Sequence, residues 1–216
     1  MGFKLVVFDL DGTLVNGEGI VSLAEKAGVR QEVEEVTDLT MKGEIDFGDA
    51  LRRRVALLEG LTRDEVEDAL CSLEMSPGAQ DVCRKIDCEI AIFSGGFLPL
   101  ARKVGDEIGA DYIRANELVE KDGVLTGDVK GDLVDNDKGE VLRQLASDIG
   151  IEHDEIIAVG DGSNDVPMFD VAGFSIGFDA KPVARKAASV NVDRRDMRLI
   201  EPYLKQKKVI RNGRVN

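Results

Sequence analysis

Three apolar runs, each ended by a polar residue, restrict what this chain can fold into. They are KLVVFD (residues 4–9), EIAIFS (89–94) and EIIAVGD (155–161). Each run is continuously apolar, whereas a strand with one face in water alternates apolar and polar residues. Continuous runs of this length are typical of strands that are covered on both faces of a parallel sheet. Shorter runs at 173–178 and 189–192 predict two further strands.

Helical patterns separate these runs. They cover residues 78–86, 97–109, 138–150 and 163–173. Strands that alternate with helices predict an α/β fold with a doubly wound, mostly parallel sheet. The pair Asp122-Gly123 is a hairpin turn signal. It predicts a small antiparallel appendage between residues 113 and 130.

Residues 16–73 contain no strand-like run and instead show four helix-sized pieces. Thr62 and Glu65 form a capping-box pattern at the start of the fourth piece. We therefore predict a small helical-bundle cap domain, residues 16–73, inserted after the first strand. The core domain would comprise residues 1–15 and 74–216. An insertion at this point would lie over the carboxyl end of the first strand.

Composition limits the partners of this chain. Its 216 residues carry a net charge of −14, from 42 acidic and 28 basic residues. Such a charge repels nucleic acid and anionic membrane surfaces, so we expect neither as a general partner, and an anionic substrate would need a local cationic site. No apolar run approaches the roughly 20 residues that span a bilayer, and the N-terminus is unlike a signal peptide. We expect a cytoplasmic protein, and the sequence leaves its oligomeric state open.

Polar side chains follow each of the three long apolar runs. Asp9 and Asp11 follow the first, Ser94-Gly95-Gly96 the second, and the stretch from Asp161 to Asp165 the third. In an open parallel sheet, ligands bind beyond the carboxyl ends of the strands. We therefore expect these groups to form one site at this edge.

Four carboxylates would crowd that edge: Asp9, Asp11, Asp161 and Asp165. Like charges at close range disfavour joint ionisation, so either a raised pKa or a bound cation is expected. Oxygen ligands select a hard ion, and Mg²⁺ is the natural candidate. A calcium loop does not fit, because both acidic stretches lack the glycine that an EF-hand loop has at its sixth position. Helix capping would account for Ser163 or Asn164 but not for Asp9.

Two features predict a phosphate site. Ser94-Gly95-Gly96 offers a hydroxyl, close backbone approach and a following helix whose N–H groups bind anions. Ser-Gly-Gly is also a plain turn, but its place opposite the aspartates favours phosphate. Lys138 stands at a predicted helix start, where a cation opposes the helix dipole unless it reaches an anion. Lys130 competes for this role but lies nearer the predicted hairpin.

These groups suffice for phosphoryl transfer. Asp9 can attack phosphorus and carry the phosphoryl group as an aspartyl phosphate. Asp11 can protonate the leaving alkoxide and later activate water. Lys138, Ser94, backbone amides and Mg²⁺ would offset the charge on the phosphoryl oxygens. The helical cap would exclude water.

The motifs DLDGT (9–13), Ser94, Lys138 and GDGSND (160–165) occur in this order. Together they resemble the four signature motifs of the phosphatase branch of the haloacid dehalogenase superfamily. The resemblance implies a Rossmann-like core with Asp9 as nucleophile and Asp11 as acid/base. It implies Mg²⁺ ligands from Asp9, the backbone carbonyl of Asp11, and Asp161, with Asp165 in support. By the same resemblance, phosphate would be held by Ser94, Gly95 and Lys138, with Asn164 close by.

The cap adds a narrower resemblance. Glu18, the string MKGEIDFGDALRRRV (41–55) and SGGF (94–97) are similar to members of this branch that hydrolyse O-phospho-L-serine, the last step of serine biosynthesis. The resemblance implies that Glu18 and Arg54 meet the ammonium and carboxylate of this substrate. Met41, Gly43 and Phe47 would close over it.

The residues themselves support one of these cap assignments. Arg54 lies on the apolar face of the helix predicted for 47–58, and its two arginine neighbours point outward. An inward arginine needs a carboxylate, either that of a substrate or that of a cap acid such as Glu44 or Asp46. Glu18 is less informative, because an acid near a helix start is favourable through the dipole alone.

Two alternatives share the core motifs: phosphotransfer to another alcohol such as homoserine, and hydrolysis of another small phosphomonoester. A third is a non-catalytic module in which Asp9 is only a phosphate acceptor. Receiver domains are of that kind, but they have no helical insertion after the first strand. Asp11 also favours turnover, because a switch does not need an acid/base group.

Overall fold

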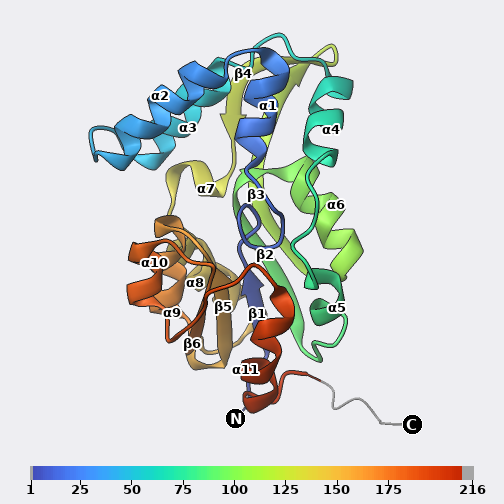
Figure 1. Ribbon diagram of the computed structural model, residues 1–216, viewed down its shortest axis with the longest axis vertical. Helices are drawn as coiled ribbons and strands as arrows, with labels where there is room; N and C mark the ends of the chain where they lie inside the picture. The colour runs from blue at the N-terminus through green and yellow to red at the C-terminus, as the bar shows by residue number, and fades with distance from the viewer. Residues whose placement is uncertain (1, 211–216) are drawn as a thin grey trace.

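The computed structural model describes residues 2–210, apart from the side chain of Met41, and contains a central sheet (Figure 1). Its strand order is β4-β3-β2-β1-β5-β6-β7. Neighbouring strands are parallel except for the antiparallel pair of β3 and β4. The predicted doubly wound, mostly parallel α/β sheet is thus confirmed. The strands are β1 Leu5–Phe8, β2 Glu89–Phe97, β3 Tyr112–Lys121, β4 Val124–Lys130, β5 Ile156–Gly160, β6 Phe174–Phe178 and β7 Val190–Val192.

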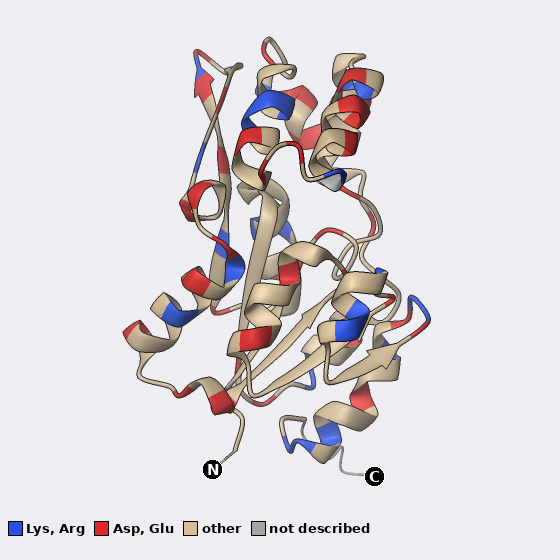
Figure 2. Cartoon of the chain, turned by 90° about the vertical axis from the view of Figure 1, so that its left-hand side faces the viewer, with Lys and Arg blue, Asp and Glu red and all other residues tan. Residues whose placement is uncertain are grey.

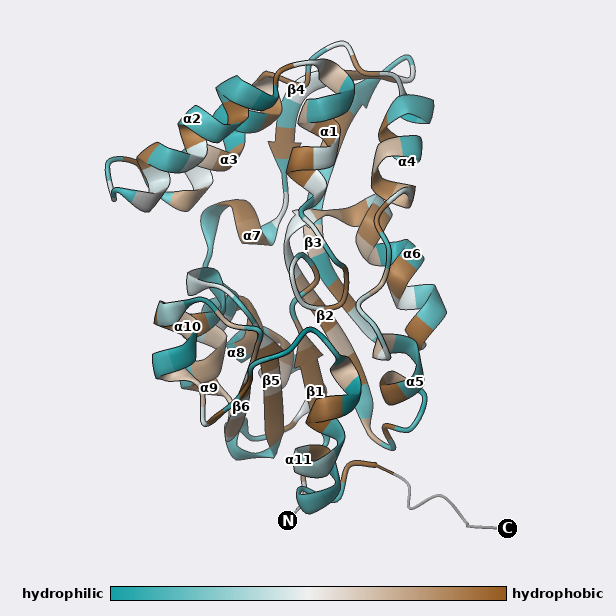
Figure 3. Ribbon diagram, viewed as in Figure 1, coloured by the Kyte–Doolittle hydropathy of each residue, from teal (hydrophilic) through white to brown (hydrophobic). Residues whose placement is uncertain are grey.

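Helices cover both faces of this sheet. Leu5 and Val7 of β1 pack with α8, α9 and α10, whereas Val6 and Phe8 pack with α5, α6 and α11. All four side chains are fully buried, which explains why the run is continuously apolar. Figure 3 shows β1 and β5 in brown between these helices. The core helices are α5 Ala79–Cys83, α6 Leu98–Ile108, α7 Asp132–Asp135, α8 Lys138–Ile149, α9 Val166–Val171, α10 Pro182–Ala187 and α11 Glu201–Gln206.

Four helices form the predicted cap above the carboxyl end of β1 (Figure 1). They are α1 Gly19–Ala27, α2 Arg30–Met41, α3 Phe47–Ala56 and α4 Arg63–Cys71. Thr62 and Glu65 make the predicted capping box at the start of α4. The division into two domains at residues 16 and 73 stays a prediction.

The hairpin differs from the small appendage that we predicted. β3 first pairs in parallel with β2 and then antiparallel with β4, so it belongs to the main sheet. Its tip also braces the cap through backbone hydrogen bonds. Gly60 N–H donates to the carbonyl of Leu125 at 3.0 Å, and Leu125 N–H donates to that of Leu61 at 2.8 Å.

Smaller differences concern helix ends. The predicted helix at 78–86 ends at Cys83, and the one at 163–173 opens with a 3₁₀ turn, Ser163–Asp165, before α9 begins. The short helices α7, α10 and α11 were not predicted, because four to six residues give too little periodicity.

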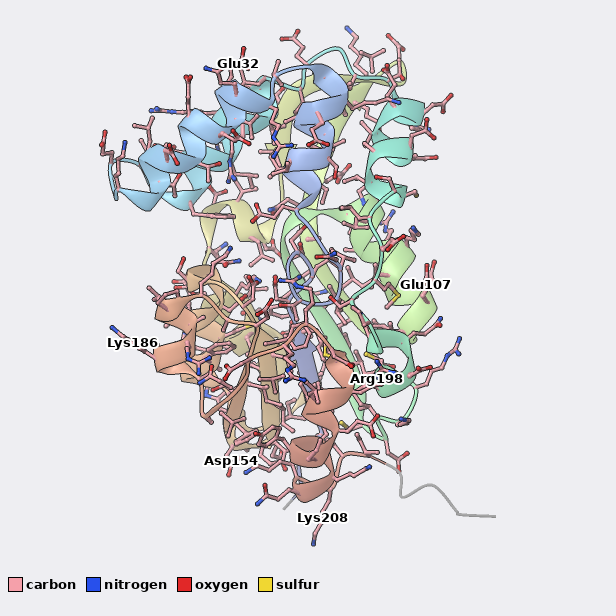
Figure 4. The ribbon with its side chains drawn as sticks, viewed as in Figure 1. Glu32, Glu107, Asp154, Lys186, Arg198 and Lys208 are labelled. Carbon is pink, nitrogen blue, oxygen red and sulfur yellow. The ribbon has the colours of Figure 1, made fainter. Side chains whose placement is uncertain are left out.

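Charged side chains lie mostly at the periphery. Glu32, Glu107, Lys186 and Lys208 point outward from the ribbon in Figure 4. Acidic and basic segments are interspersed on the face shown in Figure 2. No helix within residues 2–210 combines the length and apolar character that crossing a membrane requires.

Candidate active site

The candidate site lies where the order of the strands reverses. From β1 the chain passes through the cap to β2 and β3 on one side, and β5 to β7 follow on the other. The crevice beyond such a switch point is the usual ligand site of an open α/β sheet. Asp9 follows β1, Ser94 lies in β2 and Asp161 follows β5, so the three central strands deliver their polar groups to this crevice.

A buried lysine joins two of the aspartates. Nζ of Lys138 lies 2.5 Å from Oδ1 of Asp9 and 2.6 Å from Oδ1 of Asp165. Lys138 enters from the first residue of α8, and all three side chains are buried. A buried ammonium group requires close opposite charge, and here two carboxylates supply it. Lys130, the competing lysine, is exposed and pairs with Glu117 on the hairpin.

Burial and mutual repulsion shift the pKa values of this cluster. Burial, reinforced by the charge of Asp165, raises the pKa of Asp9 well above its ordinary value, although Lys138 opposes the shift. The pKa of Asp161 is raised by the same two causes. Burial lowers the pKa of Lys138, but the two carboxylates outweigh it and the net shift is upward. Lys138 therefore remains an ammonium group.

Three carboxylates are close enough to share one cation. Oxygen atoms of Asp9, Asp161 and Asp165 lie within 4.8 Å of one another, and all three residues are buried. Oδ2 of Asp165 also accepts from the backbone N–H groups of Asp161 and Gly162, at 2.9 Å each. A compact set of buried carboxylate oxygens fits a hard divalent cation.

The turn after β1 requires a glycine. Gly12 has φ +82°, and a Cβ atom there would lie only 2.8 Å from Oδ2 of Asp161. A side chain would therefore be strained in its backbone and would push against a carboxylate of the cluster. This explains why DLDGT has glycine directly after Asp11.

Asp11 is held from two sides. Its Oδ1 accepts from the backbone N–H of Gly19 in α1 at 2.7 Å, and its Oδ2 accepts from Oγ of Ser94 at 3.1 Å. Burial raises the pKa of Asp11, and the hydrogen bond from Gly19 partly offsets this rise. A Cβ atom on Gly96 would collide with Oδ2 of Asp11, so the second glycine of the loop is needed for close approach.

A cavity of about 310 Å³ opens above these groups, between cap and core. Its walls include Asp9, Asp11, Glu18, Phe47, Arg54 and Lys181. This volume suits a small molecule rather than a polymer.

Arg54 is buried in the wall of this cavity without an acidic partner. Its side chain is 8% exposed, and Nε donates to the carbonyl of Ala50 at 3.2 Å. Within residues 2–210, no carboxylate lies within ion-pair distance of its guanidinium, so neither Glu44 nor Asp46 pairs with it. Burial lowers the pKa of Arg54, and the more distant charge of Glu18 opposes this shift.

Glu18 lines the same cavity. It is the N-cap residue of α1, but its side chain makes no capping hydrogen bond. Its Oε1 instead lies 3.8 Å from Nζ of Lys181, which is also 3.7 Å from Oδ2 of Asp161. The side chain of Glu18 is therefore free of a helix-capping role and available to a ligand.

The remaining predicted site residues differ in their relation to the cavity. Phe47 lies over Gly95 of β2, since a Cβ on Gly95 would be 2.7 Å from Cζ of Phe47. Asn164 borders this cavity and a second one of about 330 Å³, and Phe47 lines both. Gly43, with φ +74°, is exposed and not part of the cavity wall. The side chain of Met41 lies outside the described part of the chain.

Sequence reasoning missed several residues of the cavity wall. Lys181 is the N-cap residue of α10, so it has the same signal that singled out Lys138, a cation at a helix start. Thr37 and Thr40 enter the wall from α2. Nothing local distinguishes these threonines from exposed ones, because only the placement of the cap brings them to the cavity.

Fold and site together define a hydrolase. The chain belongs to the haloacid dehalogenase-like hydrolase family, whose model matches residues 6–170. It is 41% identical over 206 residues to a protein of Methanocaldococcus jannaschii named phosphoserine phosphatase, a match that covers 94% of this chain and 98% of that relative.

Two further comparisons agree. The phosphoserine phosphatase SerB2 of Mycobacterium tuberculosis is 40% identical over 93% of this chain, which spans only 48% of that longer protein. A solved structure described as a phospho-aspartyl intermediate analogue of phosphoserine phosphatase superposes with a TM-score of 0.87. It is 41% identical, and the match covers 94% of this chain and 99% of that one.

Proposed function

We propose that this enzyme hydrolyses O-phospho-L-serine to L-serine and phosphate through an aspartyl phosphate on Asp9, with Mg²⁺ as cofactor. The environment of Arg54 is the observation that supports phosphoserine as the substrate. Its guanidinium group is buried and lines the cavity without a carboxylate partner in the described chain. Truly unpaired buried charges are costly, so a ligand carboxylate is the natural partner. The product would place the reaction as the last step of L-serine biosynthesis.

The ammonium and carboxylate groups of the substrate lie on the same carbon, and the cavity wall offers each of them an opposite charge. The guanidinium of Arg54 would bind the serine carboxylate with two parallel hydrogen bonds. Glu18, which makes no capping hydrogen bond, would accept from the substrate ammonium group. Phe47 would cover the substrate from the cap and keep water out.

The phosphoryl group would lie at the floor of the cavity. A carboxylate oxygen of Asp9 attacks phosphorus, the bond from phosphorus to the serine oxygen breaks, and Asp11 gives its proton to that oxygen. Water then attacks the phosphorus of the aspartyl phosphate while Asp11 takes a proton from it, which releases phosphate and regenerates Asp9. Lys138, Ser94 and the backbone of Gly95 would bind the phosphoryl oxygens.

The buried carboxylates would hold Mg²⁺. Asp9, Asp161 and the carbonyl of Asp11 would be ligands, and Asp165 supports them, since its own oxygens already accept from Lys138 and two backbone amides. When bound, Mg²⁺ supplies positive charge that neutralises phosphate and the aspartates together.

A matched substrate panel tests this proposal. O-Phosphoethanolamine is phosphoserine without its carboxylate, and p-nitrophenyl phosphate shares only the phosphate. With Mg²⁺, kcat/KM should be highest for phosphoserine and about 100-fold lower for phosphoethanolamine, the loss of a charge-assisted hydrogen-bond pair. Comparable values for both substrates would overturn the choice of phosphoserine. Unchanged phosphate release when homoserine is added would exclude phosphotransfer.

A further inference from the structure

The loop that carries Ser94 is a bulge in the parallel pairing of β2 and β3. Phe93 lies opposite Arg114, and Phe97 lies opposite Asn116. Three residues of β2 (94–96) therefore stand against the single residue 115 of β3. Extra residues of this kind leave the ladder, and bulges beside active sites commonly re-aim a side chain.

A buried asparagine closes this bulge. The side chain of Asn116 is fully buried, and its Nδ2 donates to the carbonyl of Gly95 at 3.0 Å. Among residues 2–210 its Oδ1 has no hydrogen-bond partner. The backbone of Gly131 covers this oxygen so closely that a Cβ atom there would be 2.7 Å from it.

Packing alone would not favour an asparagine at position 116. A buried amide with an unpaired oxygen is unfavourable, and an apolar side chain of similar size would avoid the penalty. Packing therefore does not explain why this residue is an asparagine. Its side-chain hydrogen bond goes to Gly95, in the bulge that also carries Ser94.

From Gly95 the contacts continue to Asp11. In a planar trans peptide the carbonyl and the N–H point in opposite directions, so fixing the carbonyl of Gly95 also fixes the N–H of Gly96. That N–H donates to Oγ of Ser94 at 2.9 Å. A hydroxyl that accepts there directs its own proton elsewhere, and Ser94 donates it to Oδ2 of Asp11 at 3.1 Å.

We infer that Asn116 is a positioning residue that orients Ser94, and through it Asp11, by holding the carbonyl of Gly95. This inference rests on the proposed function, because it takes Asp11 as the group that protonates the leaving oxygen. Asn116 does not touch the substrate. Supporting groups of this kind fix the geometry of residues that do.

The leaving group provides the test. The serine alkoxide is a poor leaving group, so hydrolysis of phosphoserine depends on proton donation. The p-nitrophenolate released from p-nitrophenyl phosphate is stable enough to leave without a proton. Asn116→Leu keeps the approximate size but removes the donor. Its kcat/KM should fall at least about tenfold more for phosphoserine than for p-nitrophenyl phosphate. Equal losses on both substrates would reduce Asn116 to a packing residue and overturn the inference.

Two further measurements separate positioning from folding. Leu118→Ala, at a buried position of the same strand, should lower the melting temperature and leave the ratio of the two kcat/KM values unchanged. In a double-mutant cycle on the ratio of kcat/KM for phosphoserine to that for p-nitrophenyl phosphate, Asn116→Leu should add little to the change from Ser94→Ala, because both change this ratio through Asp11. The phosphate contact that Ser94→Ala also removes is common to both substrates. Full additivity would contradict the proposed series of contacts from Asn116 through Ser94 to Asp11.

If Asn116→Leu does not fold, the same kcat/KM values are measured with Asn116→Ser instead. Inactive wild-type enzyme on both phosphates would refute the proposed function itself. An active wild-type enzyme with an unchanged ratio in the variants would refute only the role of Asn116.

Discussion

The backbone N–H of Gly19, the first residue of the cap helix α1, donates to Oδ1 of Asp11 in the core at 2.7 Å. The N-terminal end of α1 thus points its partial positive charge at this carboxylate. Cap and core meet at the group that would transfer the proton. Asp11 is therefore held jointly by the cap, through Gly19, and by the core, through Ser94.

Removing this donor should impair catalysis more than folding. Proline is favoured at the first position of a helix, and Glu18, with ψ 126°, has the backbone that precedes proline readily. Gly19→Pro deletes the N–H and displaces Asp11. We expect kcat to fall at least about tenfold, the worth of a charge-assisted hydrogen bond.

Gly19→Ala is the control for Gly19→Pro. It keeps the N–H and adds only a Cβ atom, 3.1 Å from the flexible end of Leu70. Steady-state kinetics should show a lower kcat for Gly19→Pro than for Gly19→Ala, and circular dichroism should show that both variants keep their helix content. A similar loss of kcat in both would show that the hydrogen bond to Asp11 is unimportant.

Asp9→Asn should abolish phosphate release, because an amide cannot accept and return the phosphoryl group. We expect kcat to fall by more than about 10³-fold. The fold should persist, since Lys138 keeps Asp165 as a partner and one repelling charge is removed. Acid-quenched mass spectrometry should find a phosphorylated wild-type enzyme and an unmodified variant. Asp154→Asn, an exposed substitution, is the control.

Metal binding should become more stabilising as pH rises. The pKa values of Asp9 and Asp161 are raised in the folded chain, so these carboxylates bind protons more tightly in the folded state than in the unfolded state. Their contribution to stability is present below the ordinary aspartate pKa of 3.8 and is lost as pH rises through the raised values. This loss comes from burial and from mutual repulsion of the ionised carboxylates, and a divalent cation bound to them offsets both.

Melting temperatures measured with Mg²⁺ and with a chelator, from about pH 4 to about pH 8, test this expectation. The increase due to Mg²⁺ should grow with pH in the wild-type enzyme. It should be much smaller in Asp161→Asn, whose chelated form should in turn lose less stability as pH rises. An equal Mg²⁺ effect in both proteins would place the cation elsewhere.

The sequence predicts the parts of the site that depend on local pattern. Continuous apolar runs mark the buried strands, and parallel topology sends their carboxyl ends to one edge, so Asp9, Ser94 and Asp161 could be placed together. Lys138 was identified by a local conflict, a cation at a helix start. The structure shows the reason for that conflict, namely two buried carboxylates within reach of Nζ.

The rest depends on how distant segments meet. The bracing of the cap by Leu125 joins residues about 60 positions apart, and no local signal encodes it. The absence of a cap acid beside Arg54 likewise follows from the packing of α3 against its neighbours. Asn116 looks like an ordinary strand residue until the bulge of β2 is placed beside it.

Arg54 offers the sharpest test of how the substrate is chosen. Arg54→Ala should lower kcat/KM for phosphoserine about 100-fold and hardly affect phosphoethanolamine, which has no carboxylate to bind. Arg54→Lys should recover only part of the loss, because an ammonium group cannot form the bidentate pair. Arg53→Ala, at the exposed neighbouring position, should behave like the wild-type enzyme. Equal losses on both substrates in Arg54→Ala would mean that this arginine supports the cap rather than the carboxylate.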